Sequence, residues 1–377
     1  MKPLSIGLPR QHKEHGEKRD FLPPFVARLA NFGFQVVLEG GYGSDMGFSE
    51  RDYLQLAPSI QLGSEDETYA QEYVLVLRCP REEVLARMRP GSCLLSMLHF
   101  PTRPERIDYL RSLGVEAISL DSVKDDSGRR LVENLEAVAW NGVEAAVRVL
   151  SSIYPPPGFE SADRPPVNVT LLGAGAVGTQ VVRAAINYGD GRLRRRLAQA
   201  GVPGVLASVI DYDLTNQATF MQDLLARTDI LIDATQRLDP TRSVIPNAWI
   251  ACLPEHAVLL DLSVDPYNCS VDPAFVKGIE GVPQGNLDQY VFPPDDPAYN
   301  HMPGCANARH RRYVVSCYSW PGIHPEKCML VYGRQLQPLL RTLAERGGVG
   351  QINPQGKFFE RAIARAQLSR WLPEFQG

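Results

Sequence analysis

Short apolar runs alternate with amphipathic stretches along roughly the first 150 residues of the chain. Residues 25–32 carry apolar side chains at helical spacing and are followed by Gly33, which is typical of a helix and its end. Continuous apolar runs of about four to eight residues are typical of strands buried on both faces of a parallel sheet. The runs that predict strands in this way begin at Leu4, Phe34, Tyr73, Cys93 and Val115. We therefore predict an α/β fold in which helices cover a parallel sheet.

The same alternation returns in the second part of the chain. A long helical pattern from Glu133 to Ser151 leads into the proline-rich segment 154–166, which indicates a domain boundary. Two more helical patterns, at about 326–345 and about 357–371, lie near the C-terminus and can pack back onto the first domain. The strand-like runs of the second domain lie at 167–172, 206–210, 230–232 and 257–262.

A glycine-rich turn follows the first strand of the second domain. The apolar run ends at Leu172 and leads into the pattern G-x-G-x-x-G between Gly173 and Gly178, and a helical stretch follows. Gly173 permits a tight turn, Gly175 lets a pyrophosphate approach the backbone, and Gly178 lets helix and strand pack closely. Strand, turn and helix together predict a dinucleotide-binding motif; a purely structural glycine turn is the alternative.

Asp211, at the end of the next strand, is the candidate partner of the cofactor's ribose. It lies 33 residues after Gly178 (211 − 178), and the segment 189–204 accounts for the excess over the usual spacing as an inserted surface helix. A carboxylate there accepts hydrogen bonds from ribose hydroxyls and repels a 2′-phosphate, so we expect NAD. Two alternatives stay open: an aspartate that only makes a turn, and NADP binding through arginines of the inserted helix. These arginines are Arg192, Arg194, Arg195 and Arg196.

Composition and charge argue against several classes of function. A formal net charge of −4 gives no support to nucleic-acid binding. No apolar run reaches the roughly 18 residues of a membrane span, and the first residues lack the apolar core of a signal peptide. We therefore expect a cytoplasmic protein without nucleic-acid or membrane partners.

The seven cysteines contain no C-x-x-C pair, so in a reducing compartment we expect free, buried thiols. A group of histidines and cysteines near the C-terminus does not have the paired spacing of structural zinc sites, and we expect no metal. This group comprises His301, Cys305, His310, Cys317, His324 and Cys328.

Short motifs spread over nearly the whole chain occur in an order that one enzyme family shares. They are Ile6-Gly-Leu-Pro9, Glu17-Lys-Arg19 with Pro23, Leu77-Arg78-Cys-Pro80, Leu98-His99, Asp261-Leu-Ser-Val-Asp265 and His301-Met-Pro303. With these motifs and the glycine-rich turn, the chain resembles the superfamily of alanine dehydrogenase and lysine-forming saccharopine dehydrogenase.

The resemblance implies two Rossmann-like domains with parallel sheets. Residues 1–150 and 310–377 would form a discontinuous catalytic domain, and residues 160–309 an NAD-binding domain. Similar enzymes interconvert an amine and a 2-oxo acid by hydride transfer, and they usually form symmetric homo-oligomers. An amino acid or 2-oxo acid is therefore the expected small-molecule partner, besides further copies of the chain.

The resemblance also assigns roles to single residues. Arg19 would bind the substrate carboxylate, for which a planar guanidinium is suited. His99 would be the acid/base group, and Asp265 would lie by the nicotinamide and orient water, ammonia or the amine. The alternatives are a structural ion pair for Arg19, a packed ring for His99 and a strand-end turn for Asp265. The expected cofactor-binding residues are Gly173, Gly175, Ala176, Val177, Gly178, Asp211 and Leu262.

Two residues depart from the family pattern. Arg78 stands where the family has lysine; arginine can hold a carboxylate, but it keeps its proton and cannot share acid/base work. His301 replaces an asparagine before Met-Pro and would add a second titratable group near the substrate. Two cations, Arg19 and Arg78, suggest a dicarboxylate or an opine-like conjugate as the substrate.

We therefore expect an NAD(H)-dependent amino-acid dehydrogenase that performs oxidative deamination or, in reverse, reductive amination. Arg19 and Arg78 would hold the substrate and His99 would take the proton. One alternative is an opine- or saccharopine-type reductive condensation of an amino acid with a 2-oxo acid. The other is a dinucleotide-binding sensor that has kept the fold and lost the chemistry.

Overall fold

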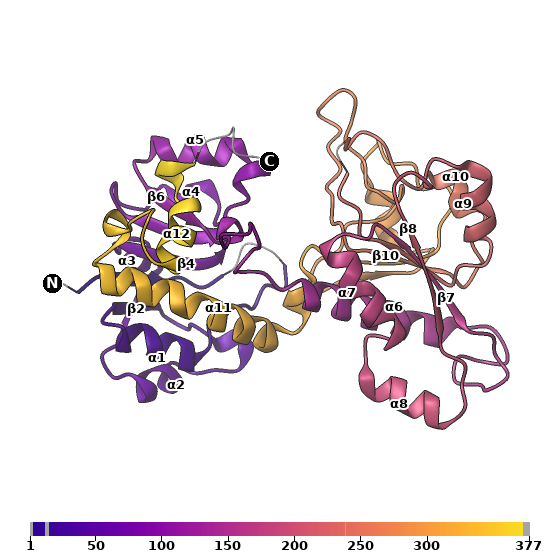
Figure 1. Ribbon diagram of the computed structural model, residues 1–377, viewed down its shortest axis with the longest axis horizontal. Helices are drawn as coiled ribbons and strands as arrows, with labels where there is room; N and C mark the ends of the chain where they lie inside the picture. The colour runs from indigo at the N-terminus through magenta and orange to yellow at the C-terminus, as the bar shows by residue number, and fades with distance from the viewer. Residues whose placement is uncertain (1–2, 12–14, 238, 372–377) are drawn as a thin grey trace. The chain divides into compact units, whose positions relative to one another are not determined.

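The computed structural model describes residues 3–11, 15–237 and 239–371, and it divides into two compact units (Figure 1). We call residues 1–134 with 324–377 the terminal unit and residues 135–323 the central unit. The N-terminal and C-terminal parts of the chain thus both contribute to one unit. The unit boundaries differ from the predicted ones near 150–160 and 310, because the structure assigns 135–150 and 310–323 to the central unit.

The terminal unit is built on a parallel sheet. Its strands are β1 (Ser5–Leu8), β2 (Gln35–Glu39), β3 (Gln61–Gly63), β4 (Tyr73–Arg78), β5 (Cys93–Met97) and β6 (Glu116–Ser119). They lie in the order β3-β2-β1-β4-β5-β6. The direction of strand addition therefore changes between β1 and β4, and ligands of open α/β sheets bind at the carboxyl ends of the strands at such a switch point.

Helices from both ends of the chain cover this sheet. They are α1 (Pro23–Asn31), α2 (Glu50–Leu56), α3 (Glu65–Tyr69), α4 (Glu82–Leu85), α5 (Pro104–Ser112), α11 (Pro325–Arg346) and α12 (Phe358–Arg365). The shorter 3-10 turns are η1 (Ser44–Met46), η2 (Phe100–Thr102), η3 (Leu120–Ser122), η6 (Val349–Gln351) and η7 (Leu368–Arg370). Figure 1 shows the yellow α11 and α12 in the same body as the indigo α1 and α2. Gly333 permits the close packing of α11 on α1, since a Cβ there would lie 3.3 Å from the ring of Phe25.

The central unit has a second, mostly parallel sheet. Its strands are β7 (Val167–Leu172), β8 (Val205–Ile210), β9 (Ile230–Asp233), β10 (Val258–Asp261), β11 (Val291–Phe292) and β12 (Tyr313–Ser316). They lie in the order β11-β12-β10-β9-β7-β8, and β11 is antiparallel to its neighbour. The switch point of this sheet lies between β7 and β9. Its helices and turns are α6 (Leu135–Ile153), α7 (Ala176–Ile186), α8 (Gly191–Gln199), α9 (Ala218–Leu225), α10 (Asn247–Ile250), η4 (Pro297–His301) and η5 (Trp320–Ile323).

Packing explains why α6 belongs to the central unit rather than to the catalytic domain that the sequence indicated. Asn141 on α6 donates a hydrogen bond from Nδ2 to the carbonyl of Trp320 at 3.0 Å. A Cβ at Gly142 would lie 2.5 Å from Leu262 Cδ2, so the missing side chain lets α6 lie directly on the end of β10. The helical pattern predicted this helix, but not which sheet it covers.

The predicted fold class is confirmed: both units are Rossmann-like, with mostly parallel sheets flanked by helices. Strands β3, β11 and β12 have no counterpart in the prediction. The last predicted helix ends at Arg365 and is followed by η7. None of the helices in the described ranges is long and apolar enough to cross a membrane.

Candidate active site

The imidazole of His99 lies against the buried carboxylate of Asp121. His99 follows β5, and Asp121 follows the neighbouring strand β6. Because both strands are parallel, their carboxyl ends meet at the same edge of the sheet. His99 Nδ1 is 3.3 Å from Asp121 Oδ2, and the side chain of His99 is 54% exposed while that of Asp121 is 5% exposed. The ring is therefore fixed on one side and open on the other.

Asp121 is fixed by several donors. Its Oδ1 accepts hydrogen bonds from the backbone N–H groups of Leu98 at 2.9 Å and His99 at 3.1 Å, and from the Ser119 hydroxyl at 3.0 Å. Burial by itself would raise the pKa of Asp121, but the contacts with His99 and Ser119 lower it to about 2. The ionised carboxylate stabilises the left-handed backbone of His99 (φ 53°) and favours the tautomer with the proton on Nδ1. His99 Nε2 is then the nitrogen that can accept a proton.

Sequence reasoning did not single out Asp121. The available signal was its place directly after an apolar strand, next in the chain to the strand that precedes His99. Only the strand order shows that these two strand ends are adjacent.

Arg19 is buried and bound to Glu17. Nε of Arg19 donates to Glu17 Oε1 at 2.7 Å, and Nη2 donates to Glu17 Oε2 at 2.5 Å. Both side chains are almost fully buried, at 3% and 0% exposed. The edge of the guanidinium formed by Nε and Nη2 is therefore engaged by Glu17 in this structure. Glu17 was part of the recognised motif, but no role was predicted for it.

Arg78 ends β4 and lies near the same carboxylate. Burial alone would raise the pKa of Glu17, but hydrogen bonds from Arg19 and the charges of Arg19 and Arg78 lower it below its ordinary value. Gln11, after β1, donates from Nε2 to Glu17 Oε2 at 3.5 Å. The three side chains Arg19, Arg78 and His99 thus lie on segments at or near the carboxyl edge of the terminal sheet, with Arg78 at the switch point.

The glycine-rich turn of the central unit has the geometry that a bound pyrophosphate requires. Gly173 has a φ of +90°, and a Cβ there would lie 2.9 Å from the carbonyl oxygen of Ala234, after β9. A Cβ at Gly178 would lie 2.1 Å from the carbonyl oxygen of Gly173. At Gly175, by contrast, a Cβ would meet nothing within 4 Å among the described atoms. Two glycines are thus required by packing, and the third leaves open space in front of the backbone.

Helix α7 begins at this open position. Gly175 is its N-cap, and Ala176 and Val177 are its first residues. The first N–H groups of a helix have no acceptor within the helix, and with the positive end of the helix dipole they form an anion site. These residues therefore fit the pyrophosphate of a dinucleotide.

Asp211 lies beside the glycine turn. It follows β8, and the N–H of Gly173 donates to the carbonyl of Ile210 at 3.0 Å, which joins the ends of β7 and β8. Asp211 is exposed, and its Oδ1 accepts the N–H of Tyr212 at 2.7 Å. Of the arginines considered for a 2′-phosphate, Arg196 of α8 pairs with Glu160 at 2.8 Å. The segment 189–204 does contain the expected inserted helix, α8.

Leu262 and Asp265 follow β10. The side chain of Leu262 is buried against Gly142 of α6, so any contact with a cofactor would come from its backbone. Asp265 Oδ2 accepts hydrogen bonds from Arg237 Nη2 at 2.8 Å and Nε at 3.1 Å. Arg237, which sequence reasoning did not identify, is 7% exposed and offsets the charge of Asp265.

His301 is exposed at the end of η4, and a disulfide ties its loop to the loop of Asp265. Cys269 and Cys305 are bonded, with 5.8 Å between their Cα atoms. Each of these cysteines lies four residues after one of the two candidate residues. The expectation of free thiols throughout is therefore wrong for this pair, since two loops distant in sequence approach closely. Of the seven cysteines, all in the described ranges, those outside a disulfide are Cys79, Cys93, Cys252, Cys317 and Cys328.

Within the described ranges, no group of three or more His, Cys, Asp or Glu side chains is arranged to hold a metal ion. In the histidine- and cysteine-rich segment, Cys305 is in the disulfide, and Cys317 and Cys328 are buried in different units.

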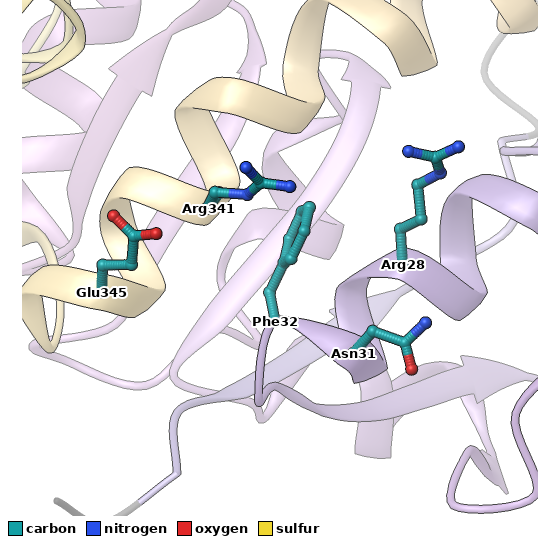
Figure 2. Close-up of a pocket in the computed structure, with 5 residues that line it drawn as sticks. All are labelled: Arg28, Asn31, Phe32, Arg341 and Glu345. Carbon is teal, nitrogen blue, oxygen red and sulfur yellow. The ribbon is translucent and has the colours of Figure 1, made fainter.

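A surface depression of about 650 Å³ lies elsewhere on the terminal unit, between α1 and α11. Figure 2 shows Phe32 and Arg341 side by side in it, and the guanidinium carbon lies 5.0 Å from the ring centroid. Phe32 leads into the amino end of β2, so this depression is at the opposite sheet edge from Arg78 and His99. It contains none of the predicted site residues.

Comparison with known proteins finds similarity to alanine dehydrogenases and to a transhydrogenase subunit. Residues 7–139 match the family model of the alanine dehydrogenase/PNT N-terminal domain. The chain is 24% identical to alanine dehydrogenase of Mycolicibacterium smegmatis, over 71% of this chain and 75% of the relative. It is 27% identical to alanine dehydrogenase of Bacillus subtilis, over 49% of this chain and 50% of the relative. It is also 24% identical to the NAD(P) transhydrogenase alpha subunit of Haemophilus influenzae, over 49% of this chain and 37% of the relative.

The matched segments thus span from about a third to three quarters of these relatives' lengths. Among solved structures, an L-alanine dehydrogenase superposes with a TM-score of 0.69 at 19% identity, over 96% of this chain and 94% of that chain. This likeness shows that the whole two-unit fold is shared. Residues 7–139 thus match the alanine dehydrogenase/PNT N-terminal domain, and the chain is similar in sequence to alanine dehydrogenases, with whose fold its own agrees.

Proposed function

We propose that the chain is an NAD(H)-dependent amino-acid dehydrogenase that interconverts an amino acid with a 2-oxo acid and ammonia. The observation that carries the proposal is the His99–Asp121 pair at the carboxyl edge of the terminal sheet. His99 follows β5, which lies next to β4, the strand that ends at Arg78. The proposal assigns substrate recognition to the terminal unit and cofactor binding to the central unit.

The cofactor half-site consists of the glycine turn, the start of α7 and Asp211. Backbone N–H groups at Ala176 and Val177 would hold the pyrophosphate, and Asp211 would accept hydrogen bonds from the ribose hydroxyls. When bound, the nicotinamide supplies the hydride acceptor or donor for the reaction. An aspartate at position 211 favours NAD over NADP because it repels a 2′-phosphate.

In the substrate half-site the chain's own residues position one carboxylate and move one proton. Arg78 binds the substrate carboxylate, and Arg19, buried with Glu17, adds its charge to the same region. His99 accepts a proton from the substrate's amine through Nε2 while Asp121 holds Nδ1. Loss of this proton together with loss of the α-hydride to the bound nicotinamide would leave an imine. Water would hydrolyse it to the 2-oxo acid and ammonia, and Asp265 is proposed to orient that water. Because arginine keeps its proton, the acid/base work at the terminal unit rests on His99.

The test combines binding and turnover. NADH and NADPH are titrated against the chain by fluorescence, and absorbance at the nicotinamide band is then followed with pyruvate and ammonium, and with pairs of amino acids and 2-oxo acids. Turnover with ammonium supports the proposal. Turnover only when a second amino acid is present would replace it with an opine- or saccharopine-type condensation. Tight NADH binding without turnover of any substrate would favour a sensor.

A further inference from the structure

The outer edge of strand β8 is open in the sheet of the central unit. β8 is the last strand in the order β11-β12-β10-β9-β7-β8, and it pairs in parallel with β7 on one side only. Of the four edge strands in the described parts of the two sheets it is the longest, with six residues against three, four and two for β3, β6 and β11. Natural proteins usually keep edge strands short or cover them, because an open edge pairs readily with another strand.

The hydrogen bonds with β7 show which backbone groups of β8 point outward. The N–H of Val167 donates to the carbonyl of Gly204 at 3.0 Å, and the N–H of Gly173 donates to the carbonyl of Ile210 at 3.0 Å. Backbone groups alternate in direction along a strand, so every second residue of β8 points its N–H and C=O toward β7 and the others point them outward. The outward-pointing residues have no hydrogen-bond partner for these groups within the described ranges. They are Val205, Ala207 and Val209.

The side chains of β8 are uncharged, and two large apolar ones are exposed. The strand reads Val-Leu-Ala-Ser-Val-Ile, and the exposed fractions are 57% for Leu206 and 42% for Val209. These two side chains lie on opposite faces of the sheet, because successive residues of a strand alternate between the faces. The strand has no lysine or proline, the residues that commonly prevent edge pairing. The edge can therefore accept a further strand, and it is apolar on both faces.

A second copy of β8 in the antiparallel direction complements this edge. With Ala207 of both copies at a two-fold axis, each Ala207 donates its N–H to the carbonyl of the other. In the same register Val205 of one copy lies opposite the partner's Val209. Every outward N–H and C=O group of the strand then has a partner. Like charges do not meet between the strands, because β8 carries none.

The charges on either side of β8 favour the antiparallel direction. Helix α8, which precedes the strand, carries four arginines and no acidic residue, and only Arg196 among them forms an ion pair with a described residue. Asp211 and Asp213, which follow the strand, are exposed. Antiparallel pairing brings the acidic end of one copy to the basic end of the other, whereas parallel pairing would bring like charges together.

We propose that the chain forms a homodimer in which the two β8 strands pair antiparallel across a two-fold axis at Ala207. The two central sheets then form one continuous sheet. A second copy is the partner because the edge matches itself in its hydrogen-bonding groups, in its apolar side chains and in the charges at its two ends. The inference does not depend on the proposed catalytic function, since it concerns only the outer edge of the central sheet.

The first experiment measures the association of the full chain by analytical ultracentrifugation between about 1 and 100 µM. A dimer is expected, and Ala207→Pro should weaken it about tenfold or more, because proline lacks the N–H that the partner's carbonyl accepts. This N–H takes no part in the pairing with β7, so the variant should unfold at nearly the wild-type temperature. Ala207→Ser keeps the N–H and is the matched control. A wild-type chain that stays monomeric, or a folded Ala207→Pro that associates like wild type, would overturn the proposal.

A second variant and a cross-link keep the test decisive if Ala207→Pro does not fold. Val209→Lys leaves the backbone unchanged, places a charge in the apolar pair and should also weaken the dimer about tenfold. Ala207→Cys should form a disulfide-linked dimer with oxidised glutathione, because the Cα atoms of opposite hydrogen-bonded residues lie about 5.5 Å apart. Leu330→Cys, 44% exposed on α11, is the control and should form little. Equal cross-linking of the two variants would contradict the register.

Discussion

His99 Nδ1 lies 3.3 Å from Asp121 Oδ2, at the carboxyl ends of two neighbouring parallel strands. The same carboxylate accepts the backbone N–H of His99 at 3.1 Å. One buried aspartate therefore fixes both the backbone and the ring of the histidine, while more than half of the surface of the histidine side chain remains exposed. A histidine that only filled the core would be buried, so this geometry favours the acid/base role over the packing role.

Replacement of Asp121 by asparagine is expected to reduce kcat about tenfold to a hundredfold with little change in KM. The amide keeps the shape of the carboxylate but weakens the preference for the tautomer in which Nε2 accepts a proton. Steady-state kinetics of Asp121→Asn and of Ser119→Ala, which leaves the His99 contact in place, separates this effect from a general loss of packing. An unchanged kcat for Asp121→Asn would contradict the role of the pair.

The stability of the terminal unit is expected to depend on pH through Asp121. Its pKa in the folded chain, about 2, is below the ordinary value of 3.8. A lowered carboxyl pKa adds stability that is fully present above about pH 4 and is lost as the pH falls toward about 2. The shift corresponds to about 2 kcal/mol. Urea unfolding between pH 3 and 6 should show that the difference in the free energy of unfolding between wild type and Asp121→Asn becomes smaller at low pH. A difference that stays constant would argue against this contribution of Asp121.

The buried pair Glu17–Arg19 should be strongly coupled. Glu17→Leu leaves a buried guanidinium without its carboxylate, and we expect it to lower the free energy of unfolding by about 3 kcal/mol or more. Glu17→Leu with Arg19→Met should cost less than the sum of the single changes, because neither charge is then left buried alone. Urea unfolding of all four chains gives the coupling energy. If the effects of the two changes on the free energy of unfolding were additive, Glu17 and Arg19 would not form this ion pair in solution.

Gly175→Ala separates cofactor binding from folding. A Cβ at Gly175 meets nothing within 4 Å among the described atoms, so stability should change by less than about 0.5 kcal/mol. NADH affinity should nevertheless fall at least tenfold, because the methyl group occupies the space in which the pyrophosphate approaches the backbone. Gly191→Ala, at the start of α8 and equally open, is the matched control and should bind NADH normally. Equal affinities for both variants would exclude the turn as the dinucleotide site.

Thiol counting tests the disulfide. Of the seven cysteines, two are bonded to each other and five are outside a disulfide. The denatured chain, purified without reductant, should react with about five equivalents of a thiol reagent, and with about seven after reduction. Cys269→Ser should give about six before and after reduction. Seven reactive thiols without reduction would show that the bond does not form under those conditions.

Features that are local in the chain could be predicted from the sequence. The apolar runs identified β4, β5 and β7, since burial on both sheet faces requires continuous apolar residues. The glycine spacing located the turn before α7, because only glycine permits the positive φ at Gly173 and the contact at Gly178. The order of the motifs was sufficient to indicate the resemblance to alanine dehydrogenases.

Features that depend on which segments meet could not be predicted in this way. Asp121 lies 22 residues after His99 in the chain (121 − 99), and Arg237 lies 28 residues before Asp265 (265 − 237). The bond between Cys269 and Cys305 joins two loops that show no paired-cysteine pattern. Which residues become partners depends on the strand order and on which loops come close to one another. Hydrophobic periodicity carries no information about either.

The sequence by itself determined most strands of both sheets and the position of the glycine turn, because these follow from local backbone preferences and apolar spacing. The resemblance to alanine dehydrogenases came from the order of short motifs. The tertiary structure alone decided which groups meet at the carboxyl edges. It placed Asp121 behind His99 and closed Glu17 on Arg19. The physical reason is that side-chain electrostatics acts through space, and only folding brings residues distant in the chain within a few ångströms of one another.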